Sequence, residues 1–164
     1  MRRSTHVLAV AAIAIGMTAP VAAPAHAATK PLKFGRFYAD QPGKDTPYTT
    51  TRLNREFIRV KNVSKKTVSL SGYLIHDRGN KHVYRFPKTF KLKAGKTVTV
   101  HTGKGRNTAA NLYWRRSSMV WNNGTRAGVI ADTAYLMKGR TKVAACNYKP
   151  TKAQLKAKTG YTNC

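Results

Sequence analysis

Acidic residues are scarce in this sequence. Its 164 residues contain 31 Lys and Arg but only five Asp and Glu, which gives a formal net charge of +26. Five acids are too few for general acid–base catalysis by paired carboxylates, or for two-metal phosphoryl chemistry, which needs several. The positive excess runs along the whole chain. A field of this sign attracts anionic polymers and speeds association with them.

Cysteine is also rare, since Cys146 and Cys164 are the only two and both lie near the C-terminus. Two cysteines without neighbouring histidines exclude a structural zinc site. In an exported chain the pair predicts one disulfide, with two free thiols as the alternative. A loop of this size stabilises the fold by about 3 kcal/mol in the chain-entropy model. We expect no metal and no other cofactor.

No apolar run is long enough to span a bilayer. The run from Val7 to Met17 is too short, follows Arg2-Arg3 and precedes the small residues Ala25-His26-Ala27. This order is typical of a secretory signal peptide, so we expect residues 1–27 to be removed. The protein is then secreted, either free or associated with the cell envelope. Its charge falls from +26 to +24, because the segment holds two arginines and no acid. General export is favoured over the twin-arginine route.

The mature chain also lacks a sustained apolar stripe at helical spacing. The clearest strand is 56–62, in which Ile58 and Val60 alternate with Phe57, Arg59 and Lys61. Further short strands are predicted at 34–38, 68–75, 82–86, 97–101, 134–137 and 142–146. Short strands separated by Gly- and Asn-rich turns indicate an antiparallel sandwich or barrel.

Two segments are expected outside this strand pattern. Residues 40–54 are rich in Pro, Gly, Thr and Asp, which predicts a long surface loop. The domain is expected to occupy 28–148, followed by a tail at 149–164 that the disulfide closes. Residues 153–158 of the tail are predicted to form one helical turn.

The serines, histidines and aspartates of the sequence are not arranged as in a typical catalytic site. Ser117 and Ser118 lie in no nucleophile elbow. His76 and Asp77 are neighbours on a predicted strand and therefore point to opposite faces. We expect no Ser-His-Asp triad among the mature histidines, which are His76, His82 and His101. Asp40 and Asp45 are interpreted as loop-forming residues rather than as calcium ligands.

Two basic segments have features that suit an anionic ligand. Residues 103–108 are rich in Gly but lack the spacing of a phosphate-binding loop, which leaves a basic loop whose amides are suited to an anion. Residues 113–116 interleave aromatics with arginines, as nucleic-acid-binding segments do. We nevertheless expect Trp114 and Trp121 to lie in the core.

Cations at turns and strand ends reach a polymer without burying charge. We predict contacts to an anionic polymer from Lys65, Lys66, Lys104, Arg106, Arg115 and Arg116. The alternative is that they only keep the protein soluble.

Six motifs follow one another along the chain. They are Glu56-Phe57-Ile58-Arg59-Val60-Lys61-Asn62, Ser69-Leu70-Ser71-Gly72-Tyr73-Leu74-Ile75-His76-Asp77, Val83-Tyr84-Arg85-Phe86-Pro87, Leu92-Lys93-Ala94-Gly95-Lys96-Thr97-Val98, His101-Thr102-Gly103-Lys104-Gly105 and Trp121-Asn122-Asn123. Motifs in this order resemble the lamin tail domain, in its secreted bacterial form. The resemblance covers roughly residues 33–148. It implies an immunoglobulin-like β-sandwich with the Glu-Phe-Ile strand at its centre, and a non-enzymatic module. The sequence departs from the family after Trp121-Asn122-Asn123, where it lacks the usual acidic turn and has no acid until Asp132.

These observations predict a binding module that attaches electrostatically to an anionic polymer. The candidates are a cell-wall polyanion, extracellular DNA and an anionic membrane surface. We expect no small-molecule substrate and no enzymatic activity, and the oligomeric state stays open. One alternative is a protein–protein or structural module of the cell envelope that pairs through an edge strand. A second is an accessory domain or weak nuclease.

Overall fold

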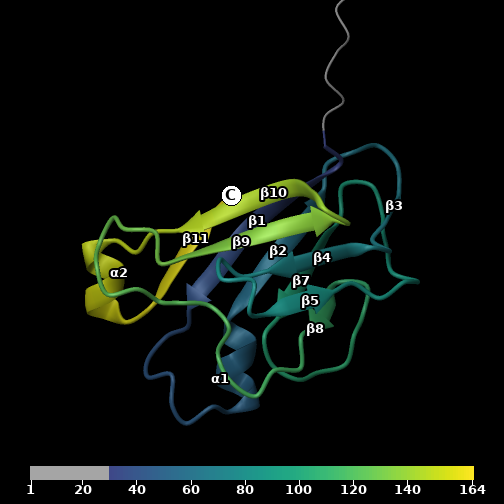
Figure 1. Ribbon diagram of the computed structural model, residues 1–164. Helices are drawn as coiled ribbons and strands as arrows, with labels where there is room; N and C mark the ends of the chain where they lie inside the picture. The colour runs from purple at the N-terminus through teal and green to yellow at the C-terminus, as the bar shows by residue number, and fades with distance from the viewer. Residues whose placement is uncertain (1–29) are drawn as a thin grey trace, which may run out of the picture.

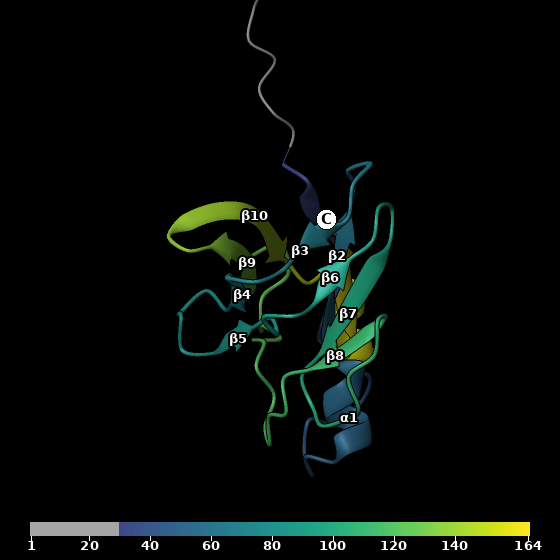
Figure 2. The same cartoon turned by 90° about the vertical axis from the view of Figure 1, so that its right-hand side faces the viewer.

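Two β-sheets lie against each other and enclose a shared core (Figure 1). The computed structural model describes residues 30–164, so the predicted signal peptide at 1–27 lies outside the described residues. One sheet has five strands in the order β11-β1-β2-β7-β8, and the other has four in the order β10-β9-β4-β5. Seen edge-on in Figure 2, β9, β10, β4 and β5 form one layer, with β2, β7 and β8 in the other. This arrangement confirms the predicted all-β, immunoglobulin-like sandwich.

The strands are short, as the turn-rich sequence predicts. The five-stranded sheet consists of β1 (Leu32–Asp40), β2 (Phe57–Asn62), β7 (Thr97–His101), β8 (Asn111–Tyr113) and β11 (Gly160–Asn163). The four-stranded sheet consists of β4 (Tyr73–His76), β5 (Val83–Arg85), β9 (Asp132–Lys138) and β10 (Thr141–Tyr148). A small ribbon pairs β3 (Val68–Ser69) with β6 (Lys91–Leu92). Neighbouring strands are antiparallel except β7 and β8, which are parallel.

Strand β2 lies in the middle of the larger sheet, as the resemblance implies. Ile58 and Val60 point inward and are 0 % exposed, whereas Arg59 and Lys61 point to solvent. Burying each aliphatic side chain contributes about 1.5–3 kcal/mol. The opposite sheet supplies the facing core residues, including Ile75, Leu136 and Tyr148. The period-two alternation in the sequence therefore places the core correctly.

The predicted surface loop at 40–54 is partly wrong, because β1 ends at Asp40 and helix α1 (Thr50–Arg55) begins within the segment. The Thr49 hydroxyl caps this helix by accepting from the amide of Arg52. Leu53 is the buried residue that anchors it. One apolar residue in six gives no helical periodicity, so the sequence pattern carried no signal for α1.

The predicted single strand at 68–75 is also divided in two. Gly72 has a φ of +77° and ends the run, and the amide of Tyr73 donates to the carbonyl of Leu70 at 3.0 Å. A positive φ suits glycine because it lacks a Cβ. The break sends β3 to the small ribbon with β6 and leaves β4 in the four-stranded sheet between β5 and β9.

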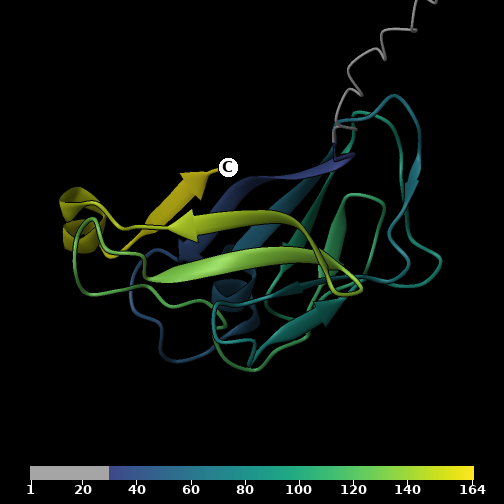
Figure 3. The ribbon, with the colours of Figure 1, turned by 45° about the horizontal axis from the view of Figure 1, so that its top comes forward.

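The C-terminal residues are built into the fold. Helix α2 (Lys152–Ala157) begins with a capping box between Thr151 and Gln154 and covers most of the predicted helical turn. Strand β11 then pairs with β1, which places it beside β10 at one edge of the sandwich (Figure 3). The predicted disulfide joins Cys146 in β10 to Cys164 after β11. Within residues 30–164, neither the length nor the apolar content of any helix reaches what a membrane crossing requires.

Removing the disulfide is expected to destabilise the fold and loosen β11. The bridge closes a loop over a sequence separation of 18. For the variant Cys146→Ala/Cys164→Ala, we expect a loss of about 3 kcal/mol in the free energy of unfolding, measured by urea denaturation. Amide hydrogen exchange in β11 should accelerate more than in β2. The parent protein under reducing conditions is the control, and equal stability of oxidised and reduced protein would contradict the expectation.

Candidate functional site

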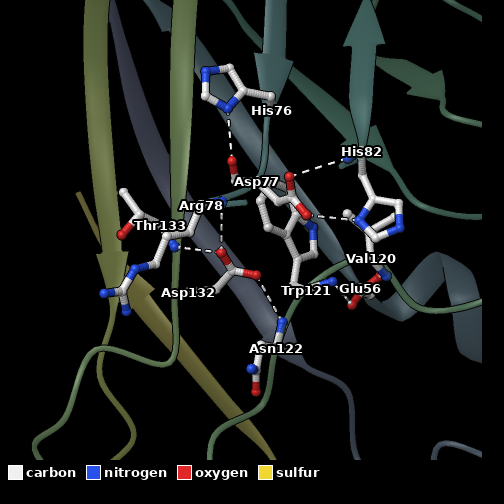
Figure 4. A network of polar contacts seen from close by, with 10 residues as sticks. All are labelled: Glu56, His76, Asp77, Arg78, His82, Val120, Trp121, Asn122, Asp132 and Thr133. Atoms are coloured by element: carbon white, nitrogen blue, oxygen red, sulfur yellow. Dashed lines mark hydrogen bonds and ion pairs between the residues drawn. The ribbon is translucent and has the colours of Figure 1, made fainter. Parts of the chain in front are cut away.

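Glu56 is an acidic residue that lies inside the protein, where its side chain is 0 % exposed. The backbone amides of Val120 and Trp121 donate to its two carboxylate oxygens at 3.1 and 2.9 Å (Figure 4). Burial raises the pKa of Glu56 to about 8, although these two amides act in the opposite direction. The carboxyl group thus holds the segment that leads from β8 towards β9 rather than facing solvent.

Asp77 and Asp132 also bind the chain internally. Asp77 accepts from the backbone amide of His82 at 3.2 Å and contacts the His82 ring nitrogen Nδ1 at 2.8 Å. Asp132 accepts from the backbone amides of Arg78, Asn122 and Thr133 at 3.0, 2.9 and 2.7 Å. Figure 4 shows Asp77 after the end of β4 with dashed lines to His82, and Asp132 with dashed lines to Arg78, Asn122 and Thr133. Both side chains are buried.

The last two acids lie near the loop after β1. Asp40 is 5 % exposed, and burial, with a smaller effect from Asp45, raises its pKa to about 6. Asp45 is half-buried and accepts from the side-chain amide of Asn123 at 3.1 Å. No group of three or more His, Cys, Asp and Glu in residues 30–164 is arranged to hold a metal ion.

Because the acids bind groups inside the fold, the lysines and arginines at the surface of residues 30–164 have no acidic partners. Of the 31 Lys and Arg, only Arg2 and Arg3 lie outside residues 30–164. Within that range the sole ion pair joins His82 to Asp77, and no Lys or Arg pairs with a carboxylate. All five acids lie in the same range and four of them are buried. The solvent therefore meets a surface whose formal charge is almost entirely positive.

The structure brings four of the six predicted contact residues together. The amides of Arg115 and Arg116 donate to the carbonyls of Gly103 and Thr102, both at 2.9 Å, so the two loops run side by side. Gly105 is required in this arrangement because a Cβ there would overlap the ring of Tyr113. The basic loop pair defined by these segments carries Lys104, Arg106, Arg115 and Arg116.

Lys65 and Lys66 lie at the opposite end of the larger sheet. They follow the end of β2, whereas the basic loop pair follows the end of β7, which runs antiparallel to β2. Six residues of strand at 3.3 Å each separate the two groups by about 20 Å. The six predicted residues thus form two separate groups.

A third group of cations lies on the open face of the five-stranded sheet. Arg36, Arg59 and Lys61 line a groove of about 420 Å³ together with polar side chains of β7, β8 and β11. The outward position of Arg59 and Lys61 was visible in the alternation of β2. Their association with Arg36 was not, because it depends on the pairing of β1 with β2.

The other aromatic and histidine side chains singled out in the sequence make contacts within the fold. Trp121 is buried with its ring centroid 4.7 Å from that of Phe37, and the half-buried Trp114 packs against Trp121 at 5.7 Å. His76 and His101 bond backbone carbonyls of Asp77 and Asn54, at 2.7 and 2.8 Å. Among residues 30–164, no hydrogen bond joins Ser117 or Ser118 to a histidine.

The buried Glu56 carboxyl is expected to make stability depend on pH. Its pKa is about 8 in the fold against an ordinary value of 4.5, so between these values the folded state holds a proton that the unfolded state has lost. The free energy of unfolding should therefore rise as pH falls from 8 towards 5, by at most about 1.4 kcal/mol per pH unit for this proton. Asp40, with a pKa of about 6, adds to the effect below pH 6.

Urea denaturation of the parent and of Glu56→Gln between pH 5 and 8 checks this. The variant should show a flatter profile, since its side chain does not titrate. A parent protein whose stability increases with pH across this window would contradict the assignment.

Among known protein families, residues 25–150 match the one described as Lamin Tail Domain. No curated protein matches the sequence. The match covers most of the chain, and the sandwich with β2 at the centre of its larger sheet is the fold that the resemblance implied. Such domains are immunoglobulin-like structural and binding modules. The chain therefore belongs to the lamin tail domain family.

Proposed function

We propose that this protein is a secreted, non-catalytic module that attaches to anionic extracellular polymers through its positive surface. The observation that supports this is the absence of any Lys or Arg paired with a carboxylate in residues 30–164. Solubility alone requires only charges of mixed sign. Because almost all the acids of this protein lie inside, its surface maintains an electrostatic field of one sign. The like charges at the surface repel one another, which acts against folding.

The basic loop pair is the main contact in this proposal. Loop tips reach a polymer chain without desolvating the cations fully. Lys65 and Lys66, about 20 Å away by strand length, add a second contact that only an extended polymer reaches at the same time. A cell-wall polyanion and extracellular DNA are extended in this way, and an anionic membrane surface offers the same charge over an area.

The cellular location rests on two features. A disulfide between Cys146 and Cys164 is typical of proteins that fold in an oxidising compartment. The signal-peptide pattern at 1–27 supports export. Both agree with an extracellular protein that meets polymers of the cell surface.

The main alternative is a structural module that binds another protein. Strand β10 favours it, because this eight-residue strand lies at the edge of its sheet and, within residues 30–164, has β9 as its one paired strand. Edge strands of this length are able to accept a strand from a partner. Binding of that kind is less sensitive to salt than binding to a polyanion.

Polymer binding is expected to be strongly salt-dependent. Several phosphate contacts predict a loss of roughly 10³-fold or more in affinity between about 50 and 200 mM salt. The quadruple variant Lys104→Gln/Arg106→Gln/Arg115→Gln/Arg116→Gln should bind DNA and cell-wall material more weakly than the parent, measured by co-sedimentation and fluorescence anisotropy.

A matched control removes four exposed lysines elsewhere, in Lys88→Gln/Lys149→Gln/Lys152→Gln/Lys156→Gln. If both quadruple variants lose affinity equally, the basic loop pair is not the contact. If the parent binds no polyanion at low salt but retains a protein partner, the alternative module is supported. Release of acid-soluble nucleotides from DNA would support the weak nuclease.

A further inference from the structure

The open face of the five-stranded sheet carries a continuous row of aromatic rings. Its members are direct cross-strand partners, one from each of the five strands: Tyr161, Tyr38, Phe57, His101 and Tyr113. Successive ring centroids are 5.6, 5.5, 5.8 and 5.0 Å apart. All five are partly exposed, and Tyr161 reaches 41 %. With neighbouring strands about 4.8 Å apart, the row crosses about 20 Å of sheet.

A polar, cationic row runs beside the aromatic one. Arg36 is the cross-strand partner of Asn163, Arg59 is the partner of Thr99, and Thr99 is the partner of Asn111. Together with Lys61 these residues line the groove of about 420 Å³ described above. The groove therefore offers cations, amides and a hydroxyl along one side of the aromatic row.

The aromatic row also positions the arginines. The guanidinium carbon of Arg36 lies 4.4 Å from the ring centroid of Tyr161, and that of Arg59 lies 5.2 Å from the centroid of Phe57. A guanidinium held on a ring keeps its second planar face and most of its N–H groups free. Neither arginine has a carboxylate partner in residues 30–164. Both are thus oriented for a planar, negatively charged ligand.

We propose that this groove binds single-stranded nucleic acid, with phosphates on Arg36, Arg59 and Lys61 and bases against the free faces of the two guanidinium groups, which the aromatic row holds from the other side. The inference rests on the proposed function and names the polymer class. Bases stack on aromatic rings and on guanidinium planes, and a basic groove beside aromatics is the usual platform for single strands. A duplex keeps its bases inside, and a polyol phosphate has no planar group to stack.

A substitution that conserves charge distinguishes binding in this groove from general attraction by the positive surface. Arg36→Lys/Arg59→Lys keeps the charge but removes the planar guanidinium. Arg126→Lys/Arg140→Lys makes the same change at two exposed arginines away from the sheet face. Fluorescence anisotropy with an oligothymidylate of about 15 nucleotides, within the site sizes of sheet-based binders, is the assay. Affinity should fall about fivefold or more for the first variant and stay unchanged for the second.

Matched ligands test the role of the bases. An abasic oligonucleotide, a duplex of the same length and poly(glycerol phosphate) should each bind the parent more weakly than the oligothymidylate. Amide chemical shifts of the parent should change along β1, β2 and β7 when the oligothymidylate is added.

Three results would overturn the site while leaving polyanion binding intact. They are equal affinity of the two Arg→Lys variants, equal affinity of the abasic and thymidylate chains, and shifts confined to the basic loop pair. If no polyanion binds the parent at low salt, the proposed function itself fails.

Discussion

Glu56 lies buried between α1 and β2 and joins parts of the chain that are distant in sequence. Its carboxylate binds the amides of Val120 and Trp121, and Trp121 then packs against Phe37 of β1. A carboxyl group without these donors would be costly at a fully buried position. The same contact fixes the path of the segment that leads towards β9. One buried acid next to β2 therefore holds a segment that lies more than 60 residues further along the chain.

This use of acids has a consequence for the surface. Asp77 and Asp132 bind backbone amides in the same way, so few acids are left to face the cations outside. The resulting self-repulsion acts against compactness. A well-filled core and the bridge between Cys146 and Cys164 act in the opposite direction. Fold and charge are thus linked, because the few acids stabilise the interior instead of offsetting the excess of Lys and Arg outside.

The positive exterior has two different parts. Cations on loops and turns, such as those of the basic loop pair, act in our proposal as a general attraction for polyanions. Arg36 and Arg59 lie on paired strands and against aromatic rings, so their orientation is fixed before a ligand arrives. Preorganised groups lose less entropy on binding than flexible ones. In our proposals the loops supply attraction, and the sheet face supplies selection among polymers.

The sequence by itself determined the fold class, the central strand, the family and the net charge. Each is readable along the chain, since alternation at Ile58 and Val60 is a local pattern and charge is a sum over residues. The structure adds α1 and the division of 68–75 at Gly72, where local signals were too weak. Only the tertiary structure decided that Asp77 pairs with His82, that the six predicted cations form two groups, and that five aromatics share one row. Residues 38, 57, 101, 113 and 161 meet because strand register aligns them, and this register joins segments that are distant in sequence, which no local pattern reveals.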